Sequence, residues 1–248
     1  MNTEPLDSAH AFARILEWDS EFFGQRIARV QAAGLVLDSG ASVVQWCKHE
    51  SVKCAYLLVD SDDQKGCDAA QAQSFRLVDL RVTLGVSSSQ LTEKTPTSPP
   101  VLVRSAMASD MNMLKAIARV SHRDTRFYVD DHFDRERCDE LYAIWIEKSC
   151  LGWAEQVFVA EVADVIAGYI TCHSHAGLGE IGLIGVGDSF RQRGIGLALG
   201  FAAGRWFGKV GDTRVSVVTS GRNAAALALY QKLGFRVSFM QYSFHKWF

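Results

Sequence analysis

The sequence predicts an α/β protein with a mixed central sheet that has splayed strands and flanking helices, together with a smaller N-terminal α/β domain. Two observations carry this prediction. Strand-like apolar runs alternate with helix-like stretches along the 248 residues. Residues 87–100, SSSQLTEKTPTSPP, concentrate Ser, Thr and Pro between two such series. We therefore expect an N-terminal α/β domain over 1–91, a linker over 92–100 and a larger domain over 101–248.

The N-terminal series begins with an expected turn over 18–24 that carries Phe22 and Phe23. The elements expected after it are a strand over 27–32, a helix over 42–50, a strand over 55–59, a short helix leading to Phe75, and a strand over 76–86. The last of these alternates apolar with polar residues, which is typical of a half-buried strand.

The second series is longer and has a definite order. We expect a strand at 101–104, helices over 110–120 and 138–149 around a charged, aromatic loop at 121–137, strands over 157–162 and 165–173, a strand from Glu180, a helix, a strand over 213–220, a helix over 224–233 and an aromatic strand at the end. Such an order favours one sheet with helices on both faces.

The stretch from Glu180 to Gly196, EIGLIGVGDSFRQRGIG, is typical of a short apolar strand that meets an Arg- and Gly-rich loop and turns into a helix. The first amides of a helix have no partner within it and lie at the positive end of its dipole, so such a junction binds anions. Gly194 and Gly196 would let an anion reach the backbone, and Arg191 and Arg193 would add charge.

Three glycines interrupt the strand before this turn, at Gly182, Gly185 and Gly187. Glycine weakens a strand interior, and it often marks a bulge or a ligand that lies against the backbone. We therefore expect this strand to splay from its neighbour and to offer its backbone groups to a bound molecule.

A second stretch, NAAALALYQKLGF from Asn223 to Phe235, follows a strand and a Gly-Arg turn. Asn223 is placed as an N-cap, and Gly234 follows the helix as its C′ residue. Because residues three, four and seven apart share a helical face, Asn223, Ala226 and Tyr230 should line one side. That side would combine a polar cap, a small residue and a hydroxyl group.

Together these stretches resemble the Gcn5-related N-acetyltransferase (GNAT) superfamily. Arg191, Gly194 and Gly196 match its Gln/Arg-x-x-Gly-x-Gly/Ala signature, and Asn223 to Phe235 matches Asn-x-x-Ala-x-x-x-Tyr-x-x-x-Gly-Phe. The resemblance implies an acyl-CoA N-acyltransferase fold that uses acetyl-CoA as co-substrate and no metal. The implied cofactor-binding residues are Ile184, Gly185, Val186, Arg191, Gln192, Arg193, Gly194, Ile195, Gly196, Asn223, Ala226 and Tyr230.

A narrower resemblance extends over most of the chain. The runs Trp18-Asp19-Ser20-x-Phe22-Phe23-Gly24 and Phe75-x-Leu77-Val78-Asp79, Arg126-Phe127, and Tyr142-x-x-Trp145-Ile146-Glu147 look like the dTDP-fucosamine acetyltransferases of the WecD type. This resemblance implies N-acetylation of a dTDP-4-amino-4,6-dideoxyhexose in the biosynthesis of a surface polysaccharide or glycan, and a possible homodimer. The loop over 121–137 departs from that family's pattern beyond Arg126-Phe127, which leaves the stereochemistry of the sugar open.

Acetyl transfer to an amine needs a proton acceptor, donors for the oxyanion and an acid for the departing thiolate. Tyr230 is the expected acid, and a backbone amide near 184–186 the expected oxyanion donor. Asp79, acting through water, and Glu180 are alternative bases, and either could instead be a solvated carboxylate at a strand end. Direct attack is expected, because no Cys or Ser near the motifs has a base arranged beside it.

A nucleotide sugar also needs an aromatic surface for its base and cations for its diphosphate. The candidate substrate-binding residues are Phe22, Phe23, Arg123, Arg126, Phe127 and Tyr128. Each could instead serve packing or a loop salt bridge. We expect no metal at Asp130, Asp131, His132 and Asp134, since no matching ligand cluster lies elsewhere in the sequence.

The composition argues against several functions. The net charge of −2 and the lack of a basic block give no indication of nucleic acid or an anionic membrane as partner. No apolar run is long enough to cross a bilayer, and the N-terminus does not have the pattern of a signal peptide, so we expect a cytoplasmic protein. The six cysteines form no CxxC pair and are expected to be reduced thiols.

Three functions remain in competition on these grounds. The first is the nucleotide-sugar acetyltransferase, the second is a GNAT enzyme that acetylates another small-molecule or protein amine, and the third is a non-catalytic acyl-CoA-binding module. Presence of both Asn223 and Tyr230 argues against the third. The aromatic, Arg-bearing loop favours an anionic substrate over a polycationic one.

Overall fold

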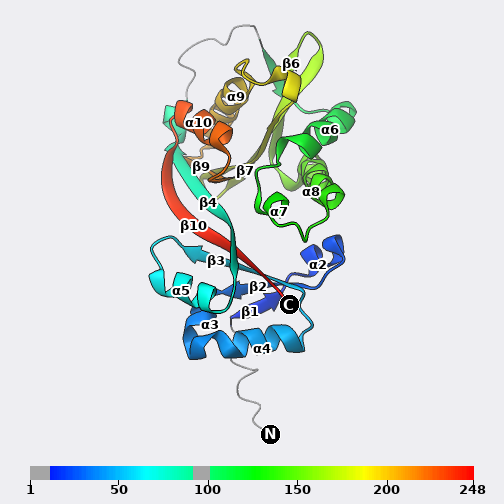
Figure 1. The fold of residues 1–248 in the computed structure, drawn as a ribbon. Coiled ribbons are helices and arrows are strands. Elements are labelled where there is room, and N and C mark those ends of the chain that lie inside the picture. Colours follow the sequence, from blue (N-terminus) through cyan, green and yellow to red (C-terminus); the bar gives the residue numbers. More distant parts are fainter. Residues whose placement is uncertain (1–11, 92–100) are drawn as a thin grey trace. The chain divides into compact units, whose positions relative to one another are not determined.

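The computed structural model describes residues 12–91 and 101–248 (Figure 1). The chain divides into two compact units, which are described separately. Unit 1 comprises Met1–Arg81, Val129–Arg137 and Met240–Phe248, and unit 2 comprises Val82–Tyr128 and Cys138–Phe239. Among the described residues, no helix combines the length and apolar character needed to span a membrane.

Unit 1 is built on a sheet with the strand order β1-β2-β3-β10-β4. Its strands are β1 (Ala13–Ile15), β2 (Ile27–Gln31), β3 (Cys54–Asp60), the end of β10 (Arg236–Trp247) and the start of β4 (Arg76–Ser87). Strand β3 pairs in parallel with β2 and antiparallel with β10. Its helices are α2 (Glu17–Phe23), α3 (Ala32–Val36), η1 (Leu37–Gly40), α4 (Ala41–His49) and α5 (Gln64–Ala72), and the core includes Leu35, Trp46, Leu57 and Phe75.

The turn expected over 18–24 is instead the helix α2, and that expectation was wrong. Glu17 and Asp19 lie in the first turn, where acidic side chains stabilise the positive end of the helix dipole. Gly24 then ends the helix in the left-handed conformation, with φ 64°. The Trp18 and Phe22 rings, one helical turn apart, stack at a centroid distance of 5.1 Å.

Unit 2 is built on a sheet with the strand order β10-β4-β9-β8-β7-β6-β5. Besides its parts of β4 and β10, the strands are β5 (Leu102–Ser105), β6 (Gln156–Val162), β7 (Val165–His175), β8 (Leu178–Val186) and β9 (Arg214–Ser220). Its helices are η2 (Ser88–Gln90), η3 (Ala108–Asp110), α6 (Met111–Ser121), α7 (Arg126–Val129), α8 (Arg135–Lys148), η4 (Ser149–Trp153), η5 (Asp188–Phe190), α9 (Ile195–Val210) and α10 (Ala224–Lys232). This is the mixed α/β architecture expected from the sequence.

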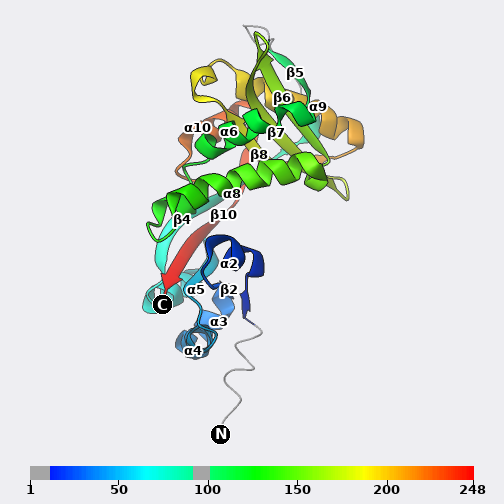
Figure 2. The ribbon, with the colours of Figure 1, turned by 90° about the vertical axis from the view of Figure 1, so that its right-hand side faces the viewer.

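The helices of unit 2 cover both faces of its sheet (Figure 1). Figure 2 shows α6 and α8 across the face of β6, β7 and β8 that is turned toward the viewer, with α9 behind the strands. Helix α10 packs against α9, where Leu233 fills the space beside Gly200. The two faces therefore carry different helix pairs, and residues of both pairs lie near the strand β8.

The segment expected as a loop over 121–137 contains regular structure, which corrects the sequence-based expectation. Residues Arg126–Val129 form the short helix α7, and α8 begins at Arg135. The Asp134 carboxylate accepts the Arg137 amide at 2.9 Å and so caps α8 three residues earlier than expected. A short polar side chain at this position caps a helix, so the helix can begin before the first residue of its hydrophobic pattern. A start predicted from hydrophobic periodicity alone is then too late in the sequence.

The two units share two strands. Strand β4 passes from unit 1 to unit 2 between Arg81 and Val82, and β10 passes back between Phe239 and Met240. The expected linker over 92–100 lies outside the described residues. Each compact unit is therefore built from segments that are far apart in the sequence. Unit 1, for example, combines the N-terminal residues with Val129–Arg137 and the end of β10.

Candidate active site

Strands β8 and β9 separate partway along their length, as the glycines of β8 led us to expect. Their parallel pairing runs from Leu178 opposite Arg214 to Ile181 opposite Val217. Beyond that point, among the described residues, no pairing joins the two strands, although β8 continues to Val186 and β9 to Ser220. One edge of β8 over 182–186 is thus open to another molecule, while its other edge pairs with β7.

A β-bulge lies at the start of the open segment. The register of β7 and β8 shifts between Ile170 and Cys172, so that Thr171 faces one extra residue of β8. The buried Thr171 hydroxyl accepts the Leu183 amide at 2.8 Å. This bond satisfies an amide that the bulge removes from the regular ladder, and it holds the open segment of β8 in its displaced course.

We expect Thr171→Val to destabilise unit 2. Valine has nearly the same shape but cannot accept a hydrogen bond, so the buried Leu183 amide loses its partner at a cost of about 1–3 kcal/mol. Urea unfolding of the two proteins measures this difference in the free energy of unfolding. Thr213→Val is the matched control, because Thr213 is exposed and its hydroxyl makes only a 3.5 Å contact. Equal stability of Thr171→Val and the control would contradict this role.

The turn between β8 and α9 presents backbone amides that have no protein partner. Gln192 and Gly194 both have positive φ, at 61° and 79°, which turns successive amides toward one side. Gly194 is the N-cap of α9 and provides no side-chain cap. Within the described residues, no hydrogen bond is formed by the amides of 192–197 as donors, and the Ala198 amide is the first that bonds back to Gly194. The helix start therefore has free donors for an anion.

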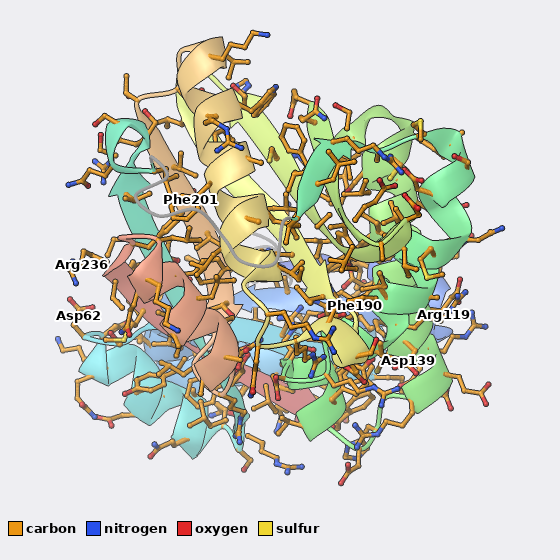
Figure 3. All side chains as sticks on the ribbon, turned by 90° about the horizontal axis from the view of Figure 1, so that it is seen from above. Asp62, Arg119, Asp139, Phe190, Phe201 and Arg236 are labelled. Atoms are coloured by element: carbon orange, nitrogen blue, oxygen red, sulfur yellow. The ribbon has the colours of Figure 1, made fainter. Side chains whose placement is uncertain are left out.

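The two arginines of this turn lie at the surface. Arg191 pairs with Asp188 at 2.9 Å, and both side chains are more than half exposed. The Arg193 guanidinium lies 5.8 Å from the centroid of the Phe190 ring. Figure 3 shows Phe190 at the turn that precedes α9. An exposed ion pair contributes little to stability, so both cations can turn toward a bound diphosphate at small cost.

Gly196 lies at a close contact between two helices. A Cβ atom at this position would lie 2.9 Å from Cδ2 of Leu229, so the missing side chain admits α10. Gly194, at φ 79°, is the glycine of this turn that has the left-handed conformation. The helix α10 is therefore set close against the first turn of α9.

Helix α10 has both of the caps that its sequence predicts. The Asn223 side chain accepts the Ala226 amide at 2.9 Å. At the other end, Gly234 has φ 93°, and the Phe235 and Gly234 amides bond to the carbonyls of Tyr230 and Gln231. This pair of bonds is a Schellman motif. It fixes the length of the helix and the position of Tyr230 in its last turn.

Tyr230 is 3% exposed, and its ring lies 5.5 Å from that of Phe235. In the described part of the chain, no hydrogen bond to its hydroxyl is found. Burial raises the pKa of Tyr230 well above its usual value. The phenol is therefore neutral and protonated at physiological pH, as a proton donor must be.

On the opposite face of the sheet, a group that the sequence did not indicate lies against the open segment of β8. A Cβ atom at Gly185 would lie 2.7 Å from Cε1 of the buried Tyr169. The Tyr169 hydroxyl is 2.9 Å from Nε2 of His122, whose ring stacks on Tyr142 at 4.6 Å. Burial lowers the pKa of His122 to about 4 and raises that of Tyr169. Only tertiary packing brings together His122 after α6, Tyr142 of α8 and Tyr169 of β7.

The two candidate bases lie in different units. Asp79 is in the β4 part of unit 1, is 9% exposed, and accepts the Leu80 amide at 2.8 Å. Glu180 is exposed on β8, opposite Ser216 in the paired part of the strand and before the opening.

The candidate sugar-site residues also divide between the units. In unit 1, the Phe22 and Phe23 rings are half-buried and meet edge to face at 4.9 Å. In unit 2, the exposed Arg123 and the half-buried Tyr128 hydroxyl both contact Asp139, a residue of α8 that Figure 3 labels.

The last two candidates adjoin each other. Arg126 lies over the Phe127 ring, with its Cζ 4.7 Å from the centroid, and the Phe127 side chain is itself buried. Phe127 therefore has little surface left for stacking on a nucleotide base, whereas the half-buried Arg126 guanidinium lies above its ring.

Two other groups of polar residues have protein partners. Among the described residues, no set of three or more His, Cys, Asp or Glu side chains could hold a metal ion. Asp130 accepts hydrogen bonds from His132, His245 and Trp247 in unit 1. His173 of β7 contacts Trp153 ring to ring and lies 3.8 Å from Glu155, while His175 is exposed.

Comparisons with known proteins match the region of this candidate site to one protein family. Residues 115–235 match the family model described as the acetyltransferase (GNAT) family, and this region contains the opened β8–β9 pair, the turn before α9 and the whole of α10. The protein is thus a GNAT-type N-acetyltransferase, an enzyme of the acyltransferase class. Enzymes of this family use acetyl-CoA as the acyl donor. A search of curated proteins found no match.

Solved structures share the fold over most of the chain. A GCN5-related N-acetyltransferase from Sphaerobacter thermophilus has a TM-score of 0.64 at 17% identity, covering 95% of this chain and 76% of its own. A functionally unknown protein from Staphylococcus epidermidis ATCC 12228 has 0.63 at 14%, covering 90% and 85%. A tandem GNAT protein from the clavulanic acid biosynthesis pathway has 0.61 at 12%, covering 90% and 76%. At these identities the likeness concerns the fold alone.

Proposed function

We propose that the protein transfers the acetyl group of acetyl-CoA to the 4-amino group of a dTDP-4-amino-4,6-dideoxyhexose by direct attack. The observation that carries the acetyl-transfer part is the opening between β8 and β9, which has unpaired helix-start amides at one end and a protonated tyrosine on the adjoining helix. The choice of acceptor rests on the aromatic and Arg-bearing motifs of the sequence.

The residues fit the cofactor in charge and shape. The free amides of 192–197, with Arg191 and Arg193 beside them, would hold the diphosphate. The open edge of β8 over Ile184–Val186 would pair with the amide groups of the pantetheine arm, as a strand pairs with an added strand. Asn223 and Ala226 would line the other side of the arm from α10.

The proposed reaction uses groups of this chain for each proton. A backbone amide of 184–186 would donate to the thioester oxygen as negative charge develops on it. Tyr230 would protonate the departing sulfur, which its neutral state allows. Asp79, acting through water, and Glu180 are the carboxylates proposed to receive the proton of the amine, and no covalent acyl-enzyme is involved.

The proposed acceptor site combines aromatic and cationic side chains. Within unit 2, Tyr128 provides a ring for thymine, and Arg123 and Arg126 provide charge for the diphosphate. Arg123 pairs with Asp139 at 3.4 Å and is more than half exposed, so a phosphate can replace that carboxylate as its partner. A site with these cationic side chains suits an anionic acceptor better than a polycationic one.

Two measurements test this function. Acetyl-CoA should raise the melting temperature, since a ligand that binds only the folded protein stabilises it by about 2.7 kcal/mol at a hundredfold excess over Kd. Mass spectrometry should then detect one added acetyl group on one of the two C4-epimeric dTDP-4-amino sugars. If acetyl-CoA stabilises the protein but neither epimer is acetylated, the proposed acceptor is wrong, and the function would be that of a GNAT enzyme that acetylates another amine. No stabilisation by acetyl-CoA would overturn the proposed cofactor site.

A further inference from the structure

We propose that His122, held by Tyr169, is the group that takes the proton from the acceptor amine. This inference rests on the proposed acetyl transfer and assigns a residue that the sequence motifs do not include. It makes His122 an alternative to Asp79 and Glu180 in that role. The reason is position, because His122 is joined by short contacts to the segment of β8 where the thioester is expected.

The first link is the contact between Tyr169 and Gly185. A Cβ atom at Gly185 would lie 2.7 Å from Cε1 and 3.1 Å from the hydroxyl oxygen of Tyr169, so any other residue at 185 would displace the ring. Tyr169 and Gly185 are register partners on β7 and β8 and therefore project to the same face. The Tyr169 hydroxyl is thus adjacent to the backbone of the open segment.

The second link is the hydrogen bond from that hydroxyl to His122. Nε2 lies 2.9 Å from the Tyr169 oxygen, and the imidazole plane is stacked within 19° of the Tyr142 ring. These two contacts fix both the position and the plane of the ring. The half-buried His122 also has a second nitrogen, Nδ1, for which no hydrogen bond is found among the described residues. In the tautomer that carries its proton on Nε2, that nitrogen has a lone pair which can accept a proton.

The faces of the sheet agree with this role. The amides for the diphosphate come from the turn into α9 and Tyr230 from α10, whereas His122 directly follows α6 and Tyr142 lies in α8, and Figure 2 shows α6 and α8 on the other face of the strands from α9. An amine that attacks the thioester must approach the carbonyl carbon from the side that the cofactor leaves open. His122 lies on the face of the sheet opposite α9.

The proton transfer can be written with every atom accounted for. The amine nitrogen bonds to the thioester carbon while the carbonyl π pair moves onto oxygen, and the nitrogen becomes positively charged, which makes its proton more acidic than that of a free ammonium group. His122 Nδ1 takes this proton, while Nε2–H donates to the Tyr169 oxygen. The oxyanion then re-forms the carbonyl as the C–S bond breaks, sulfur takes that bond's electron pair and the Tyr230 proton, His122 releases its proton to water, and Tyr230 regains one from water.

The low basicity of His122 is suited to this step. Because its pKa is lowered to about 4, the imidazole is unprotonated in nearly every molecule at neutral pH. Its lone pair is therefore available before the amine arrives. A weak base suffices for the strongly acidic ammonium of the tetrahedral adduct, whereas a free ammonium substrate must lose its proton to solvent before it binds.

The location is tested on the wild-type protein without any acceptor. In protein labelled at the histidine side chains, addition of acetyl-CoA should shift the His122 ring resonances and leave those of the exposed His175 unchanged. Coenzyme A, which lacks the acetyl group, should give a smaller shift at His122. An unchanged His122 signal in protein saturated with acetyl-CoA would overturn the inference while leaving the proposed function standing.

The role is tested by substitution and rescue. His122→Ala should lower kcat by about 100-fold, with the Kd for acetyl-CoA unchanged, and added imidazole should restore part of the rate. Tyr169→Phe keeps the ring but removes the hydroxyl, and it should lower kcat less. His175→Ala on the same strand is the control. Loss of rate without rescue by imidazole would indicate a structural role and contradict the assignment. If the wild-type protein does not bind acetyl-CoA, the proposed function itself is wrong.

Discussion

Tyr230→Phe should lower kcat by about 100-fold or more while the KM for acetyl-CoA changes little. The expected loss is confined to kcat because the hydroxyl acts on the sulfur only as the C–S bond breaks. Phenylalanine retains the ring that packs against Phe235 at 5.5 Å, and no protein hydrogen bond to the hydroxyl is found among the described residues. The substitution therefore removes a proton donor and leaves the fold intact.

Steady-state kinetics with acetyl-CoA, together with the melting temperature of each protein, measure this effect. Tyr242→Phe is the matched control, since Tyr242 is a half-buried tyrosine of β10 in unit 1. A kcat for Tyr230→Phe within about twofold of the wild type would remove Tyr230 as the acid. A fall in melting temperature that accompanies the loss of rate would instead point to packing.

Asp130→Ala should reduce the free energy of unfolding by about 3–5 kcal/mol. Asp130 is 1% exposed and accepts hydrogen bonds from Nδ1 of His132 at 2.9 Å, Nδ1 of His245 at 2.7 Å and Nε1 of Trp247 at 2.9 Å. These bonds connect the segment Val129–Arg137 to the end of β10 within unit 1. Removing the carboxylate leaves buried donors without their acceptor, which costs their full desolvation.

The adjacent carboxylate provides a control for this prediction. Asp131 is 82% exposed in its side chain and forms only a surface ion pair with Arg135, so Asp131→Ala should change the stability by less than about 1 kcal/mol. Urea unfolding followed by tryptophan fluorescence compares the two variants. Similar midpoints for both would show that the buried network contributes no more than a surface pair.

The same network sets an acid dependence of stability. Although burial acts to raise it, the hydrogen bonds from His245, Trp247 and His132 hold the pKa of Asp130 well below its usual range. A carboxyl whose pKa is lower in the folded state stabilises that state above its unfolded pKa, and the contribution is lost as the pH falls below that value. The stability difference between wild type and Asp130→Ala should therefore be full at pH 6 and smaller at about pH 3.

Local chemistry made much of the fold and part of the site predictable. The caps of α10, Asn223 and Gly234, lie where their residue types placed them, because an Asx side chain and a left-handed glycine act within a few residues of the chain. The glycines of β8 indicated the splayed strand for the same reason. The helix α2 was missed because its aromatic-rich sequence has no clear helical period, and the start of α8 was missed because a cap residue outweighs periodicity.

Contacts between distant segments were not predictable. The hydrogen bond between His122 and Tyr169 joins residues 47 positions apart, and that between Asp130 and His245 joins residues 115 apart. For residues 121–137 the sequence predicted a charged, aromatic loop, and it did not indicate which side chains these residues would contact. Which of its side chains are buried depends on packing against strands whose positions no local pattern encodes.

The sequence by itself determined the class of the enzyme, because the diphosphate turn and the tyrosine helix are short motifs whose function depends on backbone geometry and spacing along one segment. The tertiary structure alone decided that His122 bonds to Tyr169 beside Gly185, that Gly196 contacts Leu229, and that Val129–Arg137 belongs with the C-terminal strand. The physical reason is that these depend on sheet pairing and side-chain burial between segments far apart in the chain.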